Sequence, residues 1–209
     1  MKFILENLIG IVSITILTLN TIILSCLLIP LGLIKFFLPI TNIKVLFTKF
    51  IINIGELWIF TNKIWVKALH KPNWEIIGKE NIKSNGWTIA TSNHQSFADI
   101  FLLQDITNMK MPMLKFFMKY VLIYVPIIGL SWWALDMPFL KRYTKKQLEK
   151  NPKLVGKDVK EMKRALKHYS LYPVTVFSFA EGTRFTVKKH QNQNSPFDNL
   201  LKPKEGGLA

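Results

Sequence analysis

The sequence has a single cysteine, Cys26, and no charged residue between Leu8 and Ile34. One cysteine excludes an intramolecular disulfide framework and a cysteine-based metal cluster. His168 and His190 have no carboxylate or cysteine at the spacing of a zinc site. The chain also lacks a G-x-S-x-G elbow, a Walker loop and a dinucleotide fingerprint. These absences leave no pattern for a serine hydrolase, a P-loop nucleotidase or a dinucleotide-dependent oxidoreductase, and no metal is expected.

Acidic residues are scarce. The 209-residue chain has 28 Lys and Arg against 13 Asp and Glu, a net charge of +15. Such an excess favours an anionic partner, either a membrane surface or nucleic acid. The uncharged N-terminal segment favours the membrane. The most basic region, residues 141–167, does not interleave aromatic residues with its charges as a single-strand binding platform does, so no nucleic-acid partner is expected.

The 27 uncharged residues from Leu8 to Ile34 would form a helix about 40 Å long, against about 30 Å for a bilayer core. This is too long for the apolar region of a secretory signal. Pro30 and Pro39 interrupt the pattern, so the segment is predicted either as one tilted span or as a helix pair that dips into one leaflet. Lysines dominate the flank that follows, which puts the rest of the chain on the cytoplasmic side of the inner membrane.

Residues 42–70 have polar side chains every three or four positions within a wide apolar and aromatic face. This pattern is typical of a helix at the membrane interface, although an ordinary core helix would share it. His70 falls on the polar stripe and is expected in solvent. The prediction is therefore a membrane anchor with interfacial helices over residues 1–70, followed by a globular domain over residues 71–209.

The globular part alternates predicted strands with predicted helices, which indicates an α/β layer architecture. The predicted helices cover Phe97–Ile106 and Asp158–His168. The predicted strands cover Trp74–Ile77, Trp87–Ala90 as a buried strand, residues 112–118, and Pro173–Phe179.

A first candidate site follows the strand at Trp87–Ala90, in the segment Asn93-His94-Gln95-Ser96-Phe97-Ala98-Asp99. If Ser96 caps the next helix, Asp99 lies in its first turn and can reach back to the His94 ring. That contact would fix the imidazole tautomer and leave the other ring nitrogen free to take a proton. The alternative is that Ser96 and Asp99 only cap a helix.

A second candidate follows the strand at Pro173–Phe179, in Ala180-Glu181-Gly182-Thr183-Arg184. Gly182 permits a tight turn, Arg184 can hold a phosphate with its planar fork, and Glu181 can orient nearby donors. Taken by itself, this segment is only a turn with a salt bridge.

Together, Asn93-His94-x4-Asp99 and Phe179-Ala180-Glu181-Gly182-Thr183-Arg184 resemble the paired motifs of the glycerolipid acyltransferase superfamily. The middle of the chain is similar to the family as well, in Lys119-x-x-Leu122, Pro126-x-x-Gly129 and Phe139-Leu140-Lys141-Arg142. Further runs resemble the bacterial branch related to lysocardiolipin and lysophosphatidylglycerol acyltransferases: Trp132-Trp133-Ala134-Leu135-Asp136, Arg184-Phe185-Thr186, Ser195-Pro196-Phe197 and Leu200-Leu201-x-Pro203-Lys204.

The resemblance implies an α/β domain with a mixed sheet flanked by helices. It also implies transfer of an acyl group from acyl-CoA or acyl carrier protein to a lysophospholipid hydroxyl, such as that of lysophosphatidic acid, with no further cofactor. His94 would be the general base, oriented by Asp99, without an acyl-enzyme. Arg184 and Arg142 would bind the acceptor phosphate, in a site shaped by the segment from Glu181 through Gly182 and Thr183, and Lys119 is a further candidate near the headgroup.

Two positions depart from the family pattern. Ala180 stands where the family usually has proline, at a position that shapes a turn. Family members continue beyond the Pro-Lys-x-Gly-Gly segment into a fourth motif, whereas this chain ends at Ala209. The expectation is therefore a C-terminally truncated acyltransferase, with a non-catalytic membrane protein that binds anionic lipid as the alternative.

Overall fold

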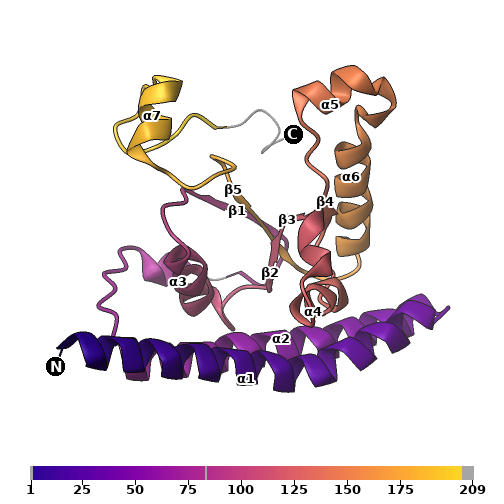
Figure 1. The fold of residues 1–209 in the computed structure, drawn as a ribbon. Helices are drawn as coiled ribbons and strands as arrows, with labels where there is room; N and C mark the ends of the chain where they lie inside the picture. Colours follow the sequence, from indigo (N-terminus) through magenta and orange to yellow (C-terminus); the bar gives the residue numbers. More distant parts are fainter. Residues whose placement is uncertain (1, 83, 204–209) are drawn as a thin grey trace. The chain divides into compact units, whose positions relative to one another are not determined.

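The computed structural model describes residues 2–82 and 84–203, and it confirms the α/β class. The chain divides into two compact units (Figure 1). The first unit contains residues 1–82 and 120–137, and the second contains residues 83–119 and 138–209. The predicted division into an anchor over residues 1–70 and an acyltransferase domain over residues 71–209 stays a prediction.

Two long helices build the first unit: α1, Lys2–Phe37, and α2, Thr41–His70. Helix α1 continues through Pro30, so the predicted interruption there is wrong; it ends before Pro39, as the restriction on residues preceding proline favours. Among the described residues α1 is the one helix long and apolar enough to cross a membrane. Length and composition alone support this, and a buried core helix or a signal sequence can share both properties.

Polar contacts join α1 and α2 as an antiparallel hairpin. The Asn20 amide donates to Asn62 Oδ1 at 2.9 Å. Near the other end of the seam, Ser13 Oγ lies 2.8 Å from His70 Nε2. His70 is exposed, as expected from the polar stripe, and it also contacts Ser13 of α1. An unpaired polar group is costly wherever water is excluded. These pairs therefore allow polar side chains to lie along the contact between two mostly apolar helices.

Helix α4, Ile128–Ala134, packs on α1 after the short 3-10 helix η2, Tyr120–Tyr124. A Cβ on Gly32 would lie 2.5 Å from the Cβ of Ala134, so only glycine permits this close approach. Beside it, Lys35 Nζ donates to Asp136 Oδ1 at 2.8 Å and to the Ala134 carbonyl at 2.7 Å. The side chains of Lys35 and Asp136 are only 10% and 17% exposed, so this ion pair is largely removed from water.

The second unit contains a three-stranded sheet of order β1-β5-β2, with β1 at Thr88–Ser92, β5 at Thr175–Phe179 and β2 at Leu114–Phe116. A separate pair joins β3, Met118–Lys119, to β4, Phe139–Leu140. Every pairing among the described strands is parallel, so the predicted mixed sheet is wrong. The predicted strands at Trp87–Ala90 and Pro173–Phe179 are confirmed with shifted ends. The single strand predicted over residues 112–118 is divided into β2 and β3, which belong to different sheets.

Two further expectations are wrong: the strand at Trp74–Ile77 and the burial of the strand now called β1. Trp74–Ile77 forms no strand: the segment finds no partner, Ile77 is 91% exposed, and the 3-10 helix η1, Lys79–Asn81, follows. Strand β1 is an edge strand with Ile89 82% exposed, so it is not the buried strand that its apolar composition suggested. An apolar run shows that a strand is favourable but does not show which of its faces is covered.

Helices of the second unit are α3 at Ala98–Thr107, α5 at Lys145–Lys150, η3 at Pro152–Leu154, α6 at Lys157–Tyr169 and α7 at Val187–Gln193. The predicted helices at Phe97–Ile106 and Asp158–His168 are confirmed as α3 and α6. The core collects around β5, where Val174 and Phe177 are buried together with Leu114 and Leu201. This core fixes the strand ends that carry both motifs.

The Lys35–Asp136 pair predicts a measurable loss of stability. Asp136→Ala leaves the Lys35 ammonium buried without its carboxylate, which we expect to lower the free energy of unfolding by about 3–5 kcal/mol. The control is Glu161→Ala, which removes the partner of Arg164 in an exposed pair at 4.0 Å and should cost no more than about 1 kcal/mol. Thermal unfolding of the detergent-solubilised chain compares the two, and equal effects would contradict the prediction.

Candidate active site

The two candidate motifs begin at neighbouring strand ends. In the parallel pairing of β1 with β5, Ser92 is opposite Phe179, and each is the last residue of its strand. The Ala180 N–H donates to the Ser92 carbonyl at 3.3 Å, which extends the pairing one step further. Both motifs therefore leave the sheet at its carboxyl edge, where ligands of open α/β sheets bind.

His94 and Asp99 contact each other directly. His94 Nδ1 lies 2.9 Å from Asp99 Oδ2, and the imidazole stacks on the Phe179 ring with centroids 3.9 Å apart. Asp99 Oδ2 also accepts the backbone N–H groups of Gln95 at 2.6 Å and Ser96 at 2.9 Å. The ring is thus held on one side by a carboxylate and on its face by an aromatic ring.

These contacts also start helix α3. Ser96 Oγ accepts the N–H of Ala98 at 3.0 Å while Asp99 accepts the N–H of Ser96, a reciprocal arrangement like that of a capping box. The helix begins at Ala98, immediately after Phe97. The N-cap position is Phe97, which makes no side-chain cap bond, so the prediction that Ser96 is the N-cap is wrong by one residue. The bonds of Asp99 hold the loop that leads into α3, and the same carboxylate orients His94.

The proton positions follow from the chemistry of the partners. An ionised carboxylate only accepts hydrogen bonds, so Nδ1 of His94 carries the hydrogen and Nε2 of the neutral ring is a lone-pair acceptor. Within residues 2–82 and 84–203, Nε2 has no hydrogen-bond partner. Burial would raise the pKa of Asp99, but the hydrogen bonds from His94, Ser96 and Gln95 outweigh it and hold this pKa below its usual value. Asp99 is therefore ionised at neutral pH.

Glu181 acts on the backbone. It is 3% exposed; its Oε1 accepts the N–H of His94 at 3.4 Å, and its Oε2 accepts the N–H of Leu201 at 3.3 Å. One carboxylate thus connects the His94 loop to a buried segment near residue 201. Within the part of the chain that the structure describes, Glu181 forms no ion pair, so the salt bridge considered for this turn is not found there.

The turn after Glu181 requires its glycine. Gly182 has φ +63°, a conformation that side chains with a Cβ rarely adopt, and its N–H donates to the Phe179 carbonyl at 2.9 Å. The chain then returns toward the first motif, where the N–H of Phe185 donates to the His94 carbonyl at 2.7 Å. This bond places Arg184 beside the His94 loop.

The Arg184 side chain is exposed and lies over the Phe97 ring, with Cζ 4.2 Å from the ring centroid. A guanidinium in this position gains a cation–π contact without losing its donors. No carboxylate of the described residues forms an ion pair with it. The structure therefore joins His94 and Asp99 directly and places the Arg184 guanidinium over Phe97, a residue of the same loop.

Sequence reasoning missed Lys189, on α7. Its Nζ donates to Thr183 Oγ1 at 2.8 Å and to the Arg184 carbonyl at 2.9 Å. The Thr183 hydroxyl oxygen is therefore already engaged by Lys189 within the Thr183–Arg184 turn. The sequence signal for this role is weak: Lys189 comes five residues after Arg184 and three after Thr186. Thr186 caps α7 with its hydroxyl, so the spacing predicts the position of Lys189 only once the start of this helix is known.

Arg142 and Lys119 lie on the separate strand pair. Arg142 follows β4 with φ +53°, and its guanidinium donates to the Phe117 carbonyl at 2.8 Å. Lys119 is exposed at the end of β3, opposite Leu140 in the register. Neither side chain contacts His94, Asp99 or Arg184 among the described residues. These two cations therefore lie at the carboxyl end of the β3–β4 pair and do not contact the His94 loop.

Comparison with known proteins decides the family. The acyltransferase family model matches residues 73–206, well over half of the chain and including both motifs. The chain belongs to the acyltransferase family. No curated protein matches it, and no solved structure matches it. Family membership implies transfer of an acyl group from a donor to an acceptor, and the paired motifs lie inside the matched region.

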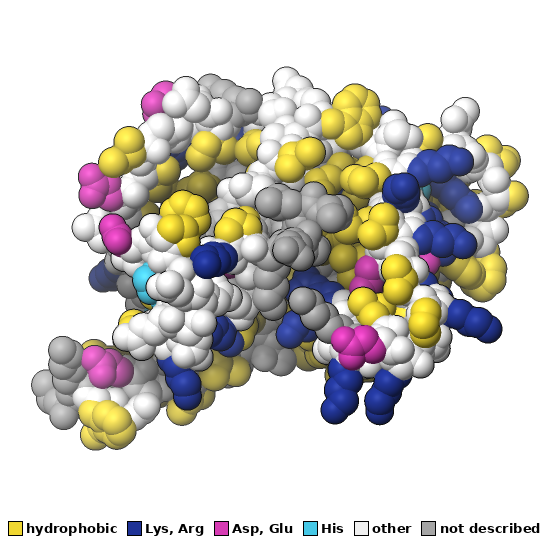
Figure 2. Space-filling model, turned by 90° about the horizontal axis from the view of Figure 1, so that it is seen from above, with side chains coloured by type: hydrophobic (Ala, Val, Ile, Leu, Met, Phe, Trp, Pro, Cys, Tyr) yellow, Lys and Arg dark blue, Asp and Glu magenta, His cyan; other side chains and the backbone are white. Residues whose placement is uncertain are grey.

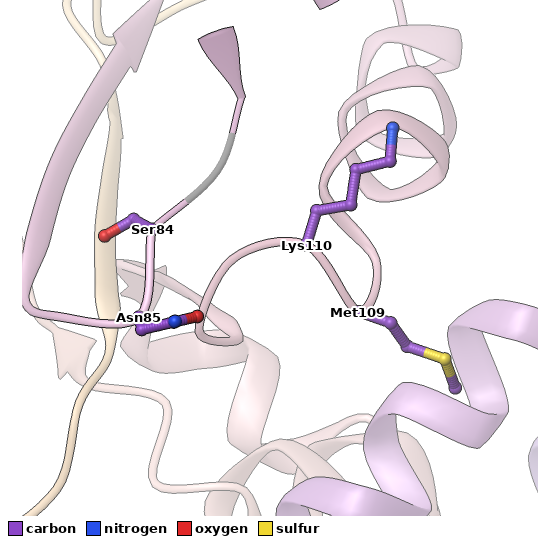
Figure 3. A pocket seen from close by; sticks show the side chains of 4 residues that line it. All are labelled: Ser84, Asn85, Met109 and Lys110. Carbon is purple, nitrogen blue, oxygen red and sulfur yellow. The ribbon is translucent and has the colours of Figure 1, made fainter. Parts of the chain in front are cut away.

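The second unit contains a hollow that does not involve the motifs. It is lined by Ser84, Asn85, Met109 and Lys110 (Figure 3). Ser84 and Asn85 precede β1, while Met109 and Lys110 lie between α3 and β2, so the hollow is at the amino edge of the sheet. His94 and Arg184 lie at the carboxyl edge. The hollow is therefore at the opposite edge of the sheet from both motifs. Among the described residues there is no group of three metal-ligating side chains.

Lys189 and its neighbour Lys188 allow a matched comparison. Lys189→Ala removes two hydrogen bonds from the Thr183–Arg184 turn and should lower the free energy of unfolding by about 1 kcal/mol. Lys188→Ala removes the same charge from an exposed side chain and should change it by less than about 0.5 kcal/mol. Thermal unfolding measures both. Indistinguishable variants would show that the Lys189 contacts do not stabilise the turn.

Proposed function

We propose that this acyltransferase transfers a fatty acyl group from an acyl thioester to the free hydroxyl of a lysophospholipid, in the manner of a 1-acylglycerol-3-phosphate O-acyltransferase. One observation carries the proposal: His94 has Nδ1 bonded to Asp99 and Nε2 without a partner among the described residues, and Arg184 lies over Phe97 of the same loop. A proton acceptor beside a cation suits an acceptor molecule that has both a hydroxyl and a phosphate.

The proposed reaction needs one base and no covalent intermediate. Nε2 of His94 takes the proton of the acceptor hydroxyl as its oxygen attacks the thioester carbonyl. The tetrahedral intermediate then collapses, the carbon–sulfur bond breaks, and the imidazolium returns the proton to the thiolate. Asp99 keeps the ring oriented and stabilises its positive charge while the proton is held. The products are the diacylated lipid and the free thiol of CoA or of acyl carrier protein.

The acceptor phosphate would be bound by Arg184, whose planar guanidinium can donate two parallel hydrogen bonds. Arg142 and Lys119 would add positive charge from the neighbouring strand pair. Glu181, Gly182 and Thr183 would support this site through the backbone, because Glu181 and Thr183 are already engaged within the turn. Lysophosphatidic acid and lysophosphatidylglycerol both have the free hydroxyl and the phosphate that the proposed reaction requires of its acceptor.

Membrane attachment through α1 would supply the acceptor, since a lysophospholipid resides in the bilayer. Helix α1 exposes large apolar side chains along its length, among them Phe3, Leu8, Ile14 and Ile23. The lysine-rich chain after it favours a cytoplasmic position for the acyltransferase unit, at the inner membrane. The bilayer is thus both the site of attachment and the source of one substrate.

An acyl-transfer assay tests this proposal. Membranes that contain the protein, and matched membranes that lack it, receive labelled acyl-CoA or acyl carrier protein with a panel of lysophospholipids. We expect labelled diacyl product only where the protein is present, and the panel identifies the acceptor. Binding of anionic lipid without product from any donor and acceptor would favour the alternative, a non-catalytic lipid-binding relative.

Arg184 gives the sharpest prediction for the acceptor. Arg184→Ala should raise the KM for the lysophospholipid by roughly 10–100-fold, because a charge-assisted contact with the phosphate is lost, and should leave the KM for the thioester nearly unchanged. Lys188→Ala is the control, since it removes a positive charge from an exposed side chain on α7. If both acceptor KM and kcat are unchanged in Arg184→Ala, Arg184 does not bind the phosphate.

A further inference from the structure

Helix α6 has two opposite faces. Met162, Ala165 and Tyr169 follow one another at spacings of three and four, and they are buried or half-buried against the unit. The outward face carries four cations at the same spacings, and all are exposed: Lys160, Lys163, Arg164 and Lys167. Residues three and four apart lie on one side of a helix, so these cations form a single ridge, here called the α6 ridge.

Little negative charge opposes this ridge. The closest ion pair is Arg164 with Glu161, at 4.0 Å and with both side chains more than half exposed. Residues 141–167 hold 11 basic residues and three acidic ones, and one of the three, Asp158, accepts the backbone N–H groups of Lys141 and Tyr143. In Figure 2, Lys and Arg side chains gather on the side where Figure 1 places α5 and α6. The ridge is a concentrated positive surface.

Aliphatic side chains border the ridge. Val159 and Leu166, seven residues apart, share one flank of α6 and are 42% and 45% exposed. Val155, just before the helix, is 66% exposed. From the helical repeat, this flank lies about 40–60° from Lys163 around the axis. A surface whose only role is to stay solvated and to repel other positively charged molecules would not require exposed valine and leucine side chains beside its lysines.

We propose that the α6 ridge binds the surface of a bilayer that contains anionic phospholipid. Lysines would pair with the headgroups while Val155, Val159 and Leu166 enter the boundary with the acyl chains, a combination typical of interfacial helices. Nucleic acid offers no counterpart for the aliphatic flank, and the ridge lacks aromatic residues for stacking on bases. An acidic protein would match the charge, but the lipid surface also matches the aliphatic flank.

This contact belongs to the acyltransferase unit itself. It is separate from attachment through α1, and it does not depend on the proposed reaction. Its consequence is that the unit carrying His94 would be held at the lipid surface by its own charges, more strongly where anionic lipid is abundant. Membranes of different composition would then bind the unit to different degrees.

A fluorescent probe on the flank tests the contact. The full-length chain with Cys26→Ser and Val159→Cys is labelled with an environment-sensitive dye and reconstituted in vesicles of phosphatidylcholine, with or without phosphatidylglycerol. We expect a blue shift only with phosphatidylglycerol, reversed when salt is raised from about 0.1 to about 0.5 M, because salt screens such contacts. The salt titration needs no further variant.

Charge-reversal variants provide the matched comparison. Lys163→Glu with Lys167→Glu should raise the phosphatidylglycerol fraction needed for half of the shift, or abolish the shift, with apparent binding weakened roughly tenfold or more. Lys188→Glu with Lys202→Glu makes the same change in net charge at exposed positions elsewhere and should leave the shift intact. Equal spectra in both lipids, equal effects of the two variants, or a shift that requires an added acidic protein or oligonucleotide would overturn the proposal.

Discussion

The parallel pairing of β1 with β5 is the constraint on which the site depends. Because Ser92 and Phe179 are paired as the last residues of their strands, two segments more than 80 positions apart leave the sheet side by side. The bonds from His94 N–H to Glu181 and from Phe185 N–H to the His94 carbonyl then join the loops. A shift in this register by one residue would separate the imidazole from Arg184 and turn Phe179, on which the ring stacks, to the other face.

The two carboxylates at this edge have different tasks. Asp99 is half-exposed, bonds the imidazole and stays ionised, whereas Glu181 is buried and accepts two backbone N–H groups. Because Glu181 is engaged by the backbone, it does not neutralise Arg184. Adjoining loops therefore carry a proton acceptor and a cation that has no carboxylate partner among the described residues, which is the combination that the proposed transfer to a phosphate-bearing alcohol requires.

Short-range patterns predicted much of this structure. The helix α6 and the strand β5 followed from periodicity and β-branched composition, and the reach of Asp99 to His94 followed from capping geometry within six residues. Long-range contacts were not accessible in the same way. The exposure of Ile89, the absence of a strand at Trp74–Ile77 and the all-parallel pairing depend on which strands meet. The roles of Glu181 and Lys189 depend on where distant backbone groups lie.

Patterns of proline and charge in the sequence also did not predict every feature of the first unit. Pro30 stands inside α1, although a proline inside a helix removes a backbone hydrogen bond, so local propensity did not predict the continuous helix. Lys35 resembles the other flanking lysines in sequence, yet it is buried against Asp136. Its partner is about a hundred positions away in the chain and within the same compact unit.

The most direct test of the account is the rate of acyl transfer by His94→Ala, measured beside its thermal unfolding. The account predicts that kcat falls by at least about 10³-fold, since the acceptor hydroxyl loses its base, while the unfolding midpoint changes little. A folded His94→Ala protein that transfers acyl groups within tenfold of the unsubstituted chain would contradict the assignment of His94 as the general base.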